Sequence, residues 1–131
     1  MSLATEAVLI IPVIVMVLTA MVAGWRIWSV RTDVRHASQA SARAASLQAS
    51  GTIARQRALE VAGSQLRGVP CRSSRVDVDT TGFARLGDAS VRVHIACTVG
   101  LDDLLLPGMP GTVDASATGS SVLDRFRERR P

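Results

Sequence analysis

The sequence has no lysine, no asparagine and no tyrosine, and aromatic residues make up only 3% of its 131 residues. So few aromatic side chains predict a modest hydrophobic core, and a chain this short has little room for a large catalytic cleft. The sequence contains no nucleophile elbow, phosphate-binding loop or complete metal-ligand motif. These absences argue against an enzyme and against a metal or any other cofactor.

The positive charge is not arranged as in nucleic-acid-binding proteins. All 15 basic residues are arginine, the formal net charge is +4, and the arginines are scattered along the chain. Because aromatic residues are not interleaved with them, the sequence offers no stacking platform for bases. We therefore expect no specific nucleic-acid partner, whereas arginines near an apolar segment would suit anionic lipid head groups.

Much of the 47% hydrophobic content lies in one segment, residues 7–25, in which Thr19 is the one clearly polar side chain. At about 1.5 Å per residue, this segment covers roughly 28 Å as a helix, close to the hydrocarbon thickness of a bilayer. Trp25 and Trp28 follow where interfacial aromatic residues are typical, and Arg26 can extend its guanidinium toward the head groups. The segment predicts a membrane-spanning helix.

Two other interpretations of the segment fit less well. A buried core helix would need more chain around it than this sequence supplies. A cleavable secretory signal would need a basic region before a shorter apolar run. The arginines that follow the segment would place the C-terminal part in the cytoplasm by the positive-inside rule, unless a basic leader precedes Met1.

Glu6 stands at the start of the apolar segment with no cation within a helical turn. A carboxylate inside the apolar layer costs about 2.5–3.5 kcal/mol, so such a group is normally paired or functional. Glu6 could instead lie in the interface, where water and the helix dipole favour it. Pro12 cannot donate a hydrogen bond to the Val8 carbonyl and so permits a kink or local unwinding.

Three segments, taken in order, resemble TadE-like pseudopilins, which are minor pilin-like proteins of the tight-adherence branch of type IV pilus systems. The first is SLATEAVLIIP, in which Glu6 precedes Pro12, and the second is the helix sequence RHASQASARAAS. The third, CTVGLDDLLLPGMPGTVDASATGSSVLDRFRERR, is similar to the C-terminal parts of actinobacterial members. Together these segments cover most of the chain.

The resemblance implies a prepilin whose basic leader is removed by a prepilin peptidase on the cytoplasmic face. Cleavage before Ser2 would make Glu6 the fifth residue of the mature chain. The resemblance also implies that the Glu6 carboxylate pairs with the freed α-amino group of a neighbouring subunit. In a low-dielectric environment such a pair would set the register of one helix against the next.

Two helices are predicted before the first strand. Gly51 is expected to end the long helix near residue 50, and Thr52 to cap a second helix that Gly68 and Pro70 stop after about Leu66. The apolar stripe of the long helix beyond the span comprises Ile27, Val30, Val34, Ala37 and Ala44. The expected buried side of the second helix comprises Ile53, Leu59, Ala62 and Leu66.

From Cys71 onward the hydrophobic period changes to two, which predicts strands. Val76, Val78 and Thr80 alternate with polar residues, and a third strand is expected over residues 112–121. The second strand presents one apolar face, formed by Val91, Val93, Ile95, Cys97 and Val99. The strands predict a small antiparallel sheet.

Cys71 and Cys97 could meet across this sheet. A disulfide closing about 26 residues would contribute roughly 3–4 kcal/mol in a small extracytoplasmic domain. The alternative is a metal site with His94, but it lacks a fourth ligand, and His94 is expected on the face opposite Cys97. We therefore predict a disulfide and no metal.

Two acidic groups invite functional interpretations that the pattern does not favour. Asp77, Asp79 and Asp88 approximate a calcium loop, but the alternation of strand residues favours a polar hairpin loop. Asp102 and Asp103 are neighbours in sequence, so we expect them to cap a helix or turn rather than to form an acid–base pair.

We therefore predict a pilin-like α+β fold with three parts. Residues 1–50 form the membrane-spanning and stalk helix, residues 51–122 form a small α+β region with the second helix and the antiparallel sheet, and residues 123–131 form a basic flexible tail. The cytoplasmic membrane is the expected location, with a single pass and the C-terminal domain extracytoplasmic or, in the pilus, extracellular.

The expected function is structural, as a minor pseudopilin that helps to start or cap assembly of a tight-adherence pilus. Its expected partners are other pilin subunits, the assembly platform, the prepilin peptidase and membrane lipid. Two alternatives remain open at this point: the major filament subunit, and a single-pass binding or sensor protein that never polymerises.

Overall fold

The computed structural model describes residues 2–85 and 87–124. The helices are α1 (Ser2–Ser46), α2 (Gly51–Gln65) and the short α3 (Leu101–Leu104), and the strands are β1 (Cys71–Asp79), β2 (Ser90–Gly100) and β3 (Thr112–Val122). Two short 3-10 helices, η1 (Leu66–Gly68) and η2 (Thr81–Ala84), flank β1. Most of the predicted basic tail, from residue 125, lies outside the described residues.

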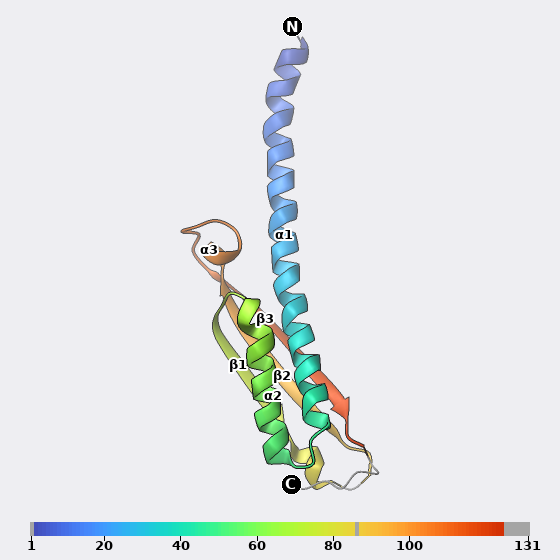
Figure 1. Ribbon diagram of the computed structural model, residues 1–131. Coiled ribbons are helices and arrows are strands. Elements are labelled where there is room, and N and C mark those ends of the chain that lie inside the picture. The colour runs from blue at the N-terminus through green and yellow to red at the C-terminus, as the bar shows by residue number, and fades with distance from the viewer. Residues whose placement is uncertain (1, 86, 125–131) are drawn as a thin grey trace.

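The head of the molecule has two layers. The three strands form an antiparallel sheet in the order β1-β2-β3, and α2 and the C-terminal half of α1 pack side by side against one face of it (Figure 1). The N-terminal half of α1 extends alone beyond this head. The predicted α+β fold, with a long first helix, a short second helix and a small antiparallel sheet, is confirmed.

The central strand β2 supplies most of the large core residues. Each residue of its predicted apolar face is at most 1% exposed, whereas His94 and Arg92 on the other face are exposed. Alternation along a strand places successive side chains on opposite faces, and the helices cover only one of them. The other face is polar and exposed, with Arg75, Asp77, Arg92, His94 and Asp114.

The contact of α1 with the sheet is made by small residues. Ala37, Ala42, Ser38 and Ser41 have no exposed surface, and the two serine hydroxyls donate to carbonyls of α1 itself. Gly119 of β3 faces this segment so closely that a Cβ atom there would collide with the backbone of Ser38. Helix and sheet therefore approach nearly backbone to backbone.

The buried face of α2 agrees with the prediction at Ala62, and Leu66 directly after the helix is partly buried, but two of the four predicted residues are not buried. Ile53 and Leu59 are 51% and 45% exposed. The buried residues of α2 are Gly51, Ala54, Ala58 and Ala62. The alanine face allows α2 to lie close to α1, and a close approach leaves no space for the larger side chains between the helices.

The junction between the helices also differs from the prediction. Gly51 begins α2 instead of ending α1, which already stops at Ser46. Ser50 rather than Thr52 is the N-cap residue, and its Oγ accepts a hydrogen bond from the Ile53 backbone N–H at 3.3 Å. Serine is a favoured N-cap residue because its side chain satisfies an N–H that the helix leaves unpaired.

The predicted disulfide joins Cys71 and Cys97, with Cα atoms 5.6 Å apart. It depends on a β-bulge, since Cys71 is opposite Val99 and Ser73 is opposite Thr98. In a regular strand Cys71 would lie on the same face as Ser73, away from the helices. The extra residue at Arg72 turns Cys71 to the face that Cys97 occupies.

The segment with calcium-like spacing forms the end of β1 and the polar connection that follows it. Asp79 Oδ1 accepts hydrogen bonds from the Thr81 hydroxyl at 2.7 Å and the Thr81 backbone N–H at 3.0 Å. These two bonds lower the pKa of the Asp79 carboxyl below its usual range. Their contribution to stability is complete above the unfolded-state pKa of about 3.9 and is lost as the pH falls through the lower folded-state value.

Replacing Gly119 by Ala should destabilise the protein by about 1–3 kcal/mol, the usual cost of inserting a methyl group into a close-packed core. The measurement is urea-induced unfolding of the full chain in detergent micelles, followed by circular dichroism. Gly63→Ala is the matched control, because nothing lies within 4 Å of a Cβ at that helical position. It should be neutral or stabilising, and equal midpoints for the two variants would contradict the close approach.

Replacing both cysteines by alanine should lower the free energy of unfolding by roughly 3–4 kcal/mol, since the bridge closes a sequence separation of 26 residues. The same urea titration measures this loss, and reductant should produce a similar loss in the unmodified chain. A midpoint that neither treatment moves would show that the bridge does not stabilise the fold.

Candidate membrane and assembly site

The N-terminal half of α1 makes almost no contact with the rest of the molecule. Every residue from 3 to 22 is exposed, including the large apolar side chains. The helix is long and apolar enough to cross a membrane, and its most apolar part lies free of the head (Figure 1). Apolar surface of this extent is covered by lipid or by other proteins, which fits a single-pass membrane anchor.

Glu6 is exposed near the free end of this helix, and no ion pair joins it to another residue in the ranges 2–85 and 87–124. Pro12 lies inside α1, which continues across it without interruption. Thr19 donates its hydroxyl hydrogen to the Val15 carbonyl at 2.8 Å. That bond satisfies the hydroxyl within the helix, as an apolar environment requires.

Trp25 and Trp28 are 64% and 63% exposed, where α1 leaves the head. Between them, Arg26 Nη1 donates a hydrogen bond to the Leu104 carbonyl at 2.7 Å. Arg26 is thus bound to the connection between β2 and β3, a contact that sequence reasoning missed. The one sign of this contact in the sequence is the uncharged run LLLPGMPG in the connection, since apolar loop residues suit a position beside an apolar helix.

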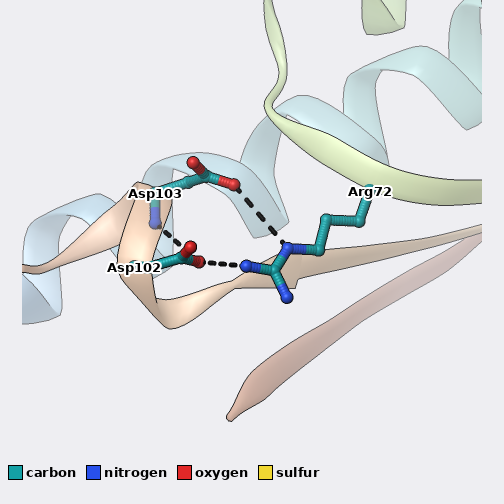
Figure 2. A network of polar contacts seen from close by, with 3 residues as sticks. All are labelled: Arg72, Asp102 and Asp103. Carbon is teal, nitrogen blue, oxygen red and sulfur yellow. Dashed lines mark hydrogen bonds and ion pairs between the residues drawn. The ribbon is translucent and has the colours of Figure 1, made fainter. Parts of the chain in front are cut away.

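Figure 2 shows how Arg72 holds the other side of that connection. Its Nη2 binds Asp102 Oδ1, and its Nε lies 3.9 Å from Asp103 Oδ2. Asp102 Oδ1 also accepts the Asp103 backbone N–H at 3.1 Å. A Cβ atom on Gly100 would collide with the Arg72 guanidinium and with Asp102, so this glycine makes the arrangement possible.

The two carboxylates do not have the predicted capping role. Gly100 is the N-cap residue of α3, with no side-chain capping bond, and Asp102 and Asp103 lie in the first turn. There the helix dipole favours negative charge, although a helix this short has a weak one. Their ion pairs with Arg72 of the neighbouring strand β1 dominate the arrangement.

The proposed alternative use of the cysteines for metal binding is not compatible with the geometry. Both sulfur atoms are in the disulfide, and the His94 ring lies on the outer face of the sheet, where Nδ1 is 2.8 Å from Thr118 Oγ1. His94 therefore faces away from Cys97, as the strand alternation predicted.

A family model described as TadE-like protein matches residues 1–43. The N-terminal helix is therefore similar to that family. The match confirms the resemblance stated from the sequence for these residues, which are about a third of the chain. No curated protein and no solved structure matches the chain.

The TadE-like segment contains one group of the predicted site residues and leaves out the other. Glu6, Pro12 and the interfacial group from Trp25 to Trp28 lie within it. The disulfide and the Arg72 network lie in the head, outside the match.

Replacing Arg72 by Gln should loosen the β2–β3 connection, residues 101–111, with little effect on global stability. The ion pairs are partly exposed, and such pairs contribute about 0–1 kcal/mol. The measurement is amide hydrogen exchange of the connection, which should become faster, and high salt should reproduce part of the effect.

Arg75→Gln is the control for this prediction. Arg75 is more exposed and has a comparable 3.9 Å ion pair, with Asp77, on the same strand. Exchange in the connection should not respond to it. If both variants exchange alike, Arg72 does not hold the connection.

Proposed function

We propose that this chain is a structural pilin-like subunit, a minor pseudopilin that helps to start or cap assembly of a tight-adherence pilus. The observation that carries the proposal is the division of α1. Its C-terminal half forms part of a compact head, while its N-terminal half is bare, apolar and ends in an exposed carboxylate. The proposal assigns no catalytic step to the chain.

A bare apolar helix on a folded head is suited to transfer from lipid to a helical bundle. In the membrane, acyl chains cover the exposed side chains of residues 3–22. In a filament, the same side chains would pack against the corresponding helices of neighbouring subunits. Because both environments are apolar, the transfer depends on packing and on polar contacts more than on burial.

Glu6 is the polar contact that such a transfer would use. In the proposal, a prepilin peptidase removes a basic leader before Ser2, and the Glu6 carboxylate of one subunit pairs with the α-amino group of the next. An unpaired carboxylate in the apolar layer is costly, so pairing would both drive and register the addition of a subunit. The exposed position of Glu6 supports this role.

The head would lie outside the cytoplasmic membrane, and outside the cell in an assembled pilus. The disulfide supports this side, since such bonds persist in oxidising compartments. The partners would be other pilin subunits and the assembly platform, with membrane lipid around α1 before assembly.

Replacing Glu6 by Ala should reduce the number of surface filaments by an order of magnitude or more while leaving the protein in the membrane, because the helix still inserts but lacks its pairing carboxylate. The measurement is a count of filaments by electron microscopy, together with immunoblots of the membrane fraction and of material sheared from the cell surface.

Glu60→Ala is the matched control, since Glu60 is an exposed glutamate on α2 whose ion pair with Arg57 is of a weak kind. It should leave the filament count unchanged. An unchanged count with Glu6→Ala would remove the proposed role of that carboxylate. A chain that is abundant throughout the filament would be the major subunit, and one that never leaves the membrane fraction would be an anchored binding or sensor protein.

A further inference from the structure

We propose that the apolar loop, defined as residues 104–109, is a second membrane contact that enters the bilayer interface beside α1. The loop contacts the leaflet on the side of the head, and its partner there is phospholipid. The proposal rests on α1 crossing the membrane and does not depend on filament assembly.

The loop has the composition of a lipid contact. From residue 104 to residue 111 there is no charged side chain, and Leu106 and Met109 are 59% and 40% exposed. Leu104 packs inward at 4% exposure and Leu105 is partly buried against the core, which leaves Leu106 and Met109 at the surface. Exposed leucine and methionine beside one another are unfavourable in water and favourable in acyl chains.

The backbone of the loop also suits an apolar environment. Pro107 in the loop and Pro110 directly after it have no N–H group that would need a partner. The Leu105 N–H donates to the Leu101 carbonyl at 2.9 Å, and the Met109 N–H donates to the Leu106 carbonyl at 3.2 Å. These features reduce the number of unpaired donors, which is the main obstacle to placing a loop near lipid.

The position of the loop along α1 sets its depth. A groove runs between the two, lined by Met16, Thr19 and Arg26 on α1 and by Leu106 and Met109 on the loop. The α1 residues span about 15 Å along the helix axis, and most of this length belongs to the predicted span, residues 7–25. A bilayer that covers this span also reaches the height of the loop.

Two arginines hold the loop at that height. Arg26, at the interfacial end of the span, donates to the Leu104 carbonyl. Arg72 pairs with Asp102 and Asp103, the carboxylates that immediately precede the apolar run. Arg72 thereby compensates the charge of the two carboxylates. The apolar loop itself carries no charge that would keep it out of lipid.

The test places an environment-sensitive fluorophore on the loop. The full chain, with its disulfide intact, carries Leu106→Cys labelled with nitrobenzoxadiazole in vesicles of phosphatidylcholine and phosphatidylglycerol. Some of the lipids carry a doxyl quencher, either near the head group or deep in the acyl chain. We expect blue-shifted emission and severalfold stronger quenching by the shallow quencher than by the deep one. Met109→Cys should give the same result and guards against a local effect of one substitution.

Two labelled controls bracket this measurement. Leu59→Cys on α2 is a partly exposed leucine of the head and should not be quenched by either lipid. Val15→Cys, in the middle of the predicted span, should be quenched more strongly by the deep quencher. If the label at Val15 is quenched but the loop labels, like the label at Leu59, are not, the loop proposal alone is overturned. If the label at Val15 is not quenched, the membrane span and the loop proposal are overturned together.

Dilution separates lipid from a second copy of the chain. Quenching that persists when the protein is diluted to about one chain per vesicle supports a lipid contact. Emission that shifts to the blue only at high protein density, without doxyl quenching, shows that a neighbouring copy covers the loop and overturns the proposal.

Discussion

The fold depends on how closely α1 approaches the sheet. Gly119 has no side chain and faces the backbone of Ser38 and Gln39 on α1, and the buried hydroxyls of Ser38 and Ser41 are satisfied within their own helix. Larger residues would separate the layers, and a polar side chain without such a bond would be costly to bury. Because this contact fixes α1 on the sheet, it also fixes the direction in which the bare half of the helix leaves the head.

The close approach explains why some features could be predicted from the sequence and others could not. The long helix, the period-two strands and the inward face of β2 follow from local patterns, which packing reinforces. The buried face of α2 does not follow from such a pattern. Ile53 and Leu59 are more apolar than Ala54 and Ala58, but the neighbouring helix requires the small size of the alanines.

The candidate site divides in the same way. Glu6, Pro12 and the tryptophans could be singled out because each is unusual in its sequence context. The partners of Arg26 and Arg72 could not, since they lie 78 and 30 residues away and depend on where the β2–β3 connection is placed. The disulfide was predictable as a pairing, but the bulge that turns Cys71 inward leaves no pattern in the sequence.

The continuity of α1 has a mechanical consequence. One uninterrupted helix forms both the bare apolar segment and a layer of the head, so a pull along its axis reaches the sheet without passing through a hinge. The helix lies lengthwise on the sheet, and such a load acts as shear on many contacts at once instead of peeling them apart one by one. Close-packed interiors have low compressibility and transmit strain. A pull on the bare half of α1 should therefore move the head as one rigid unit.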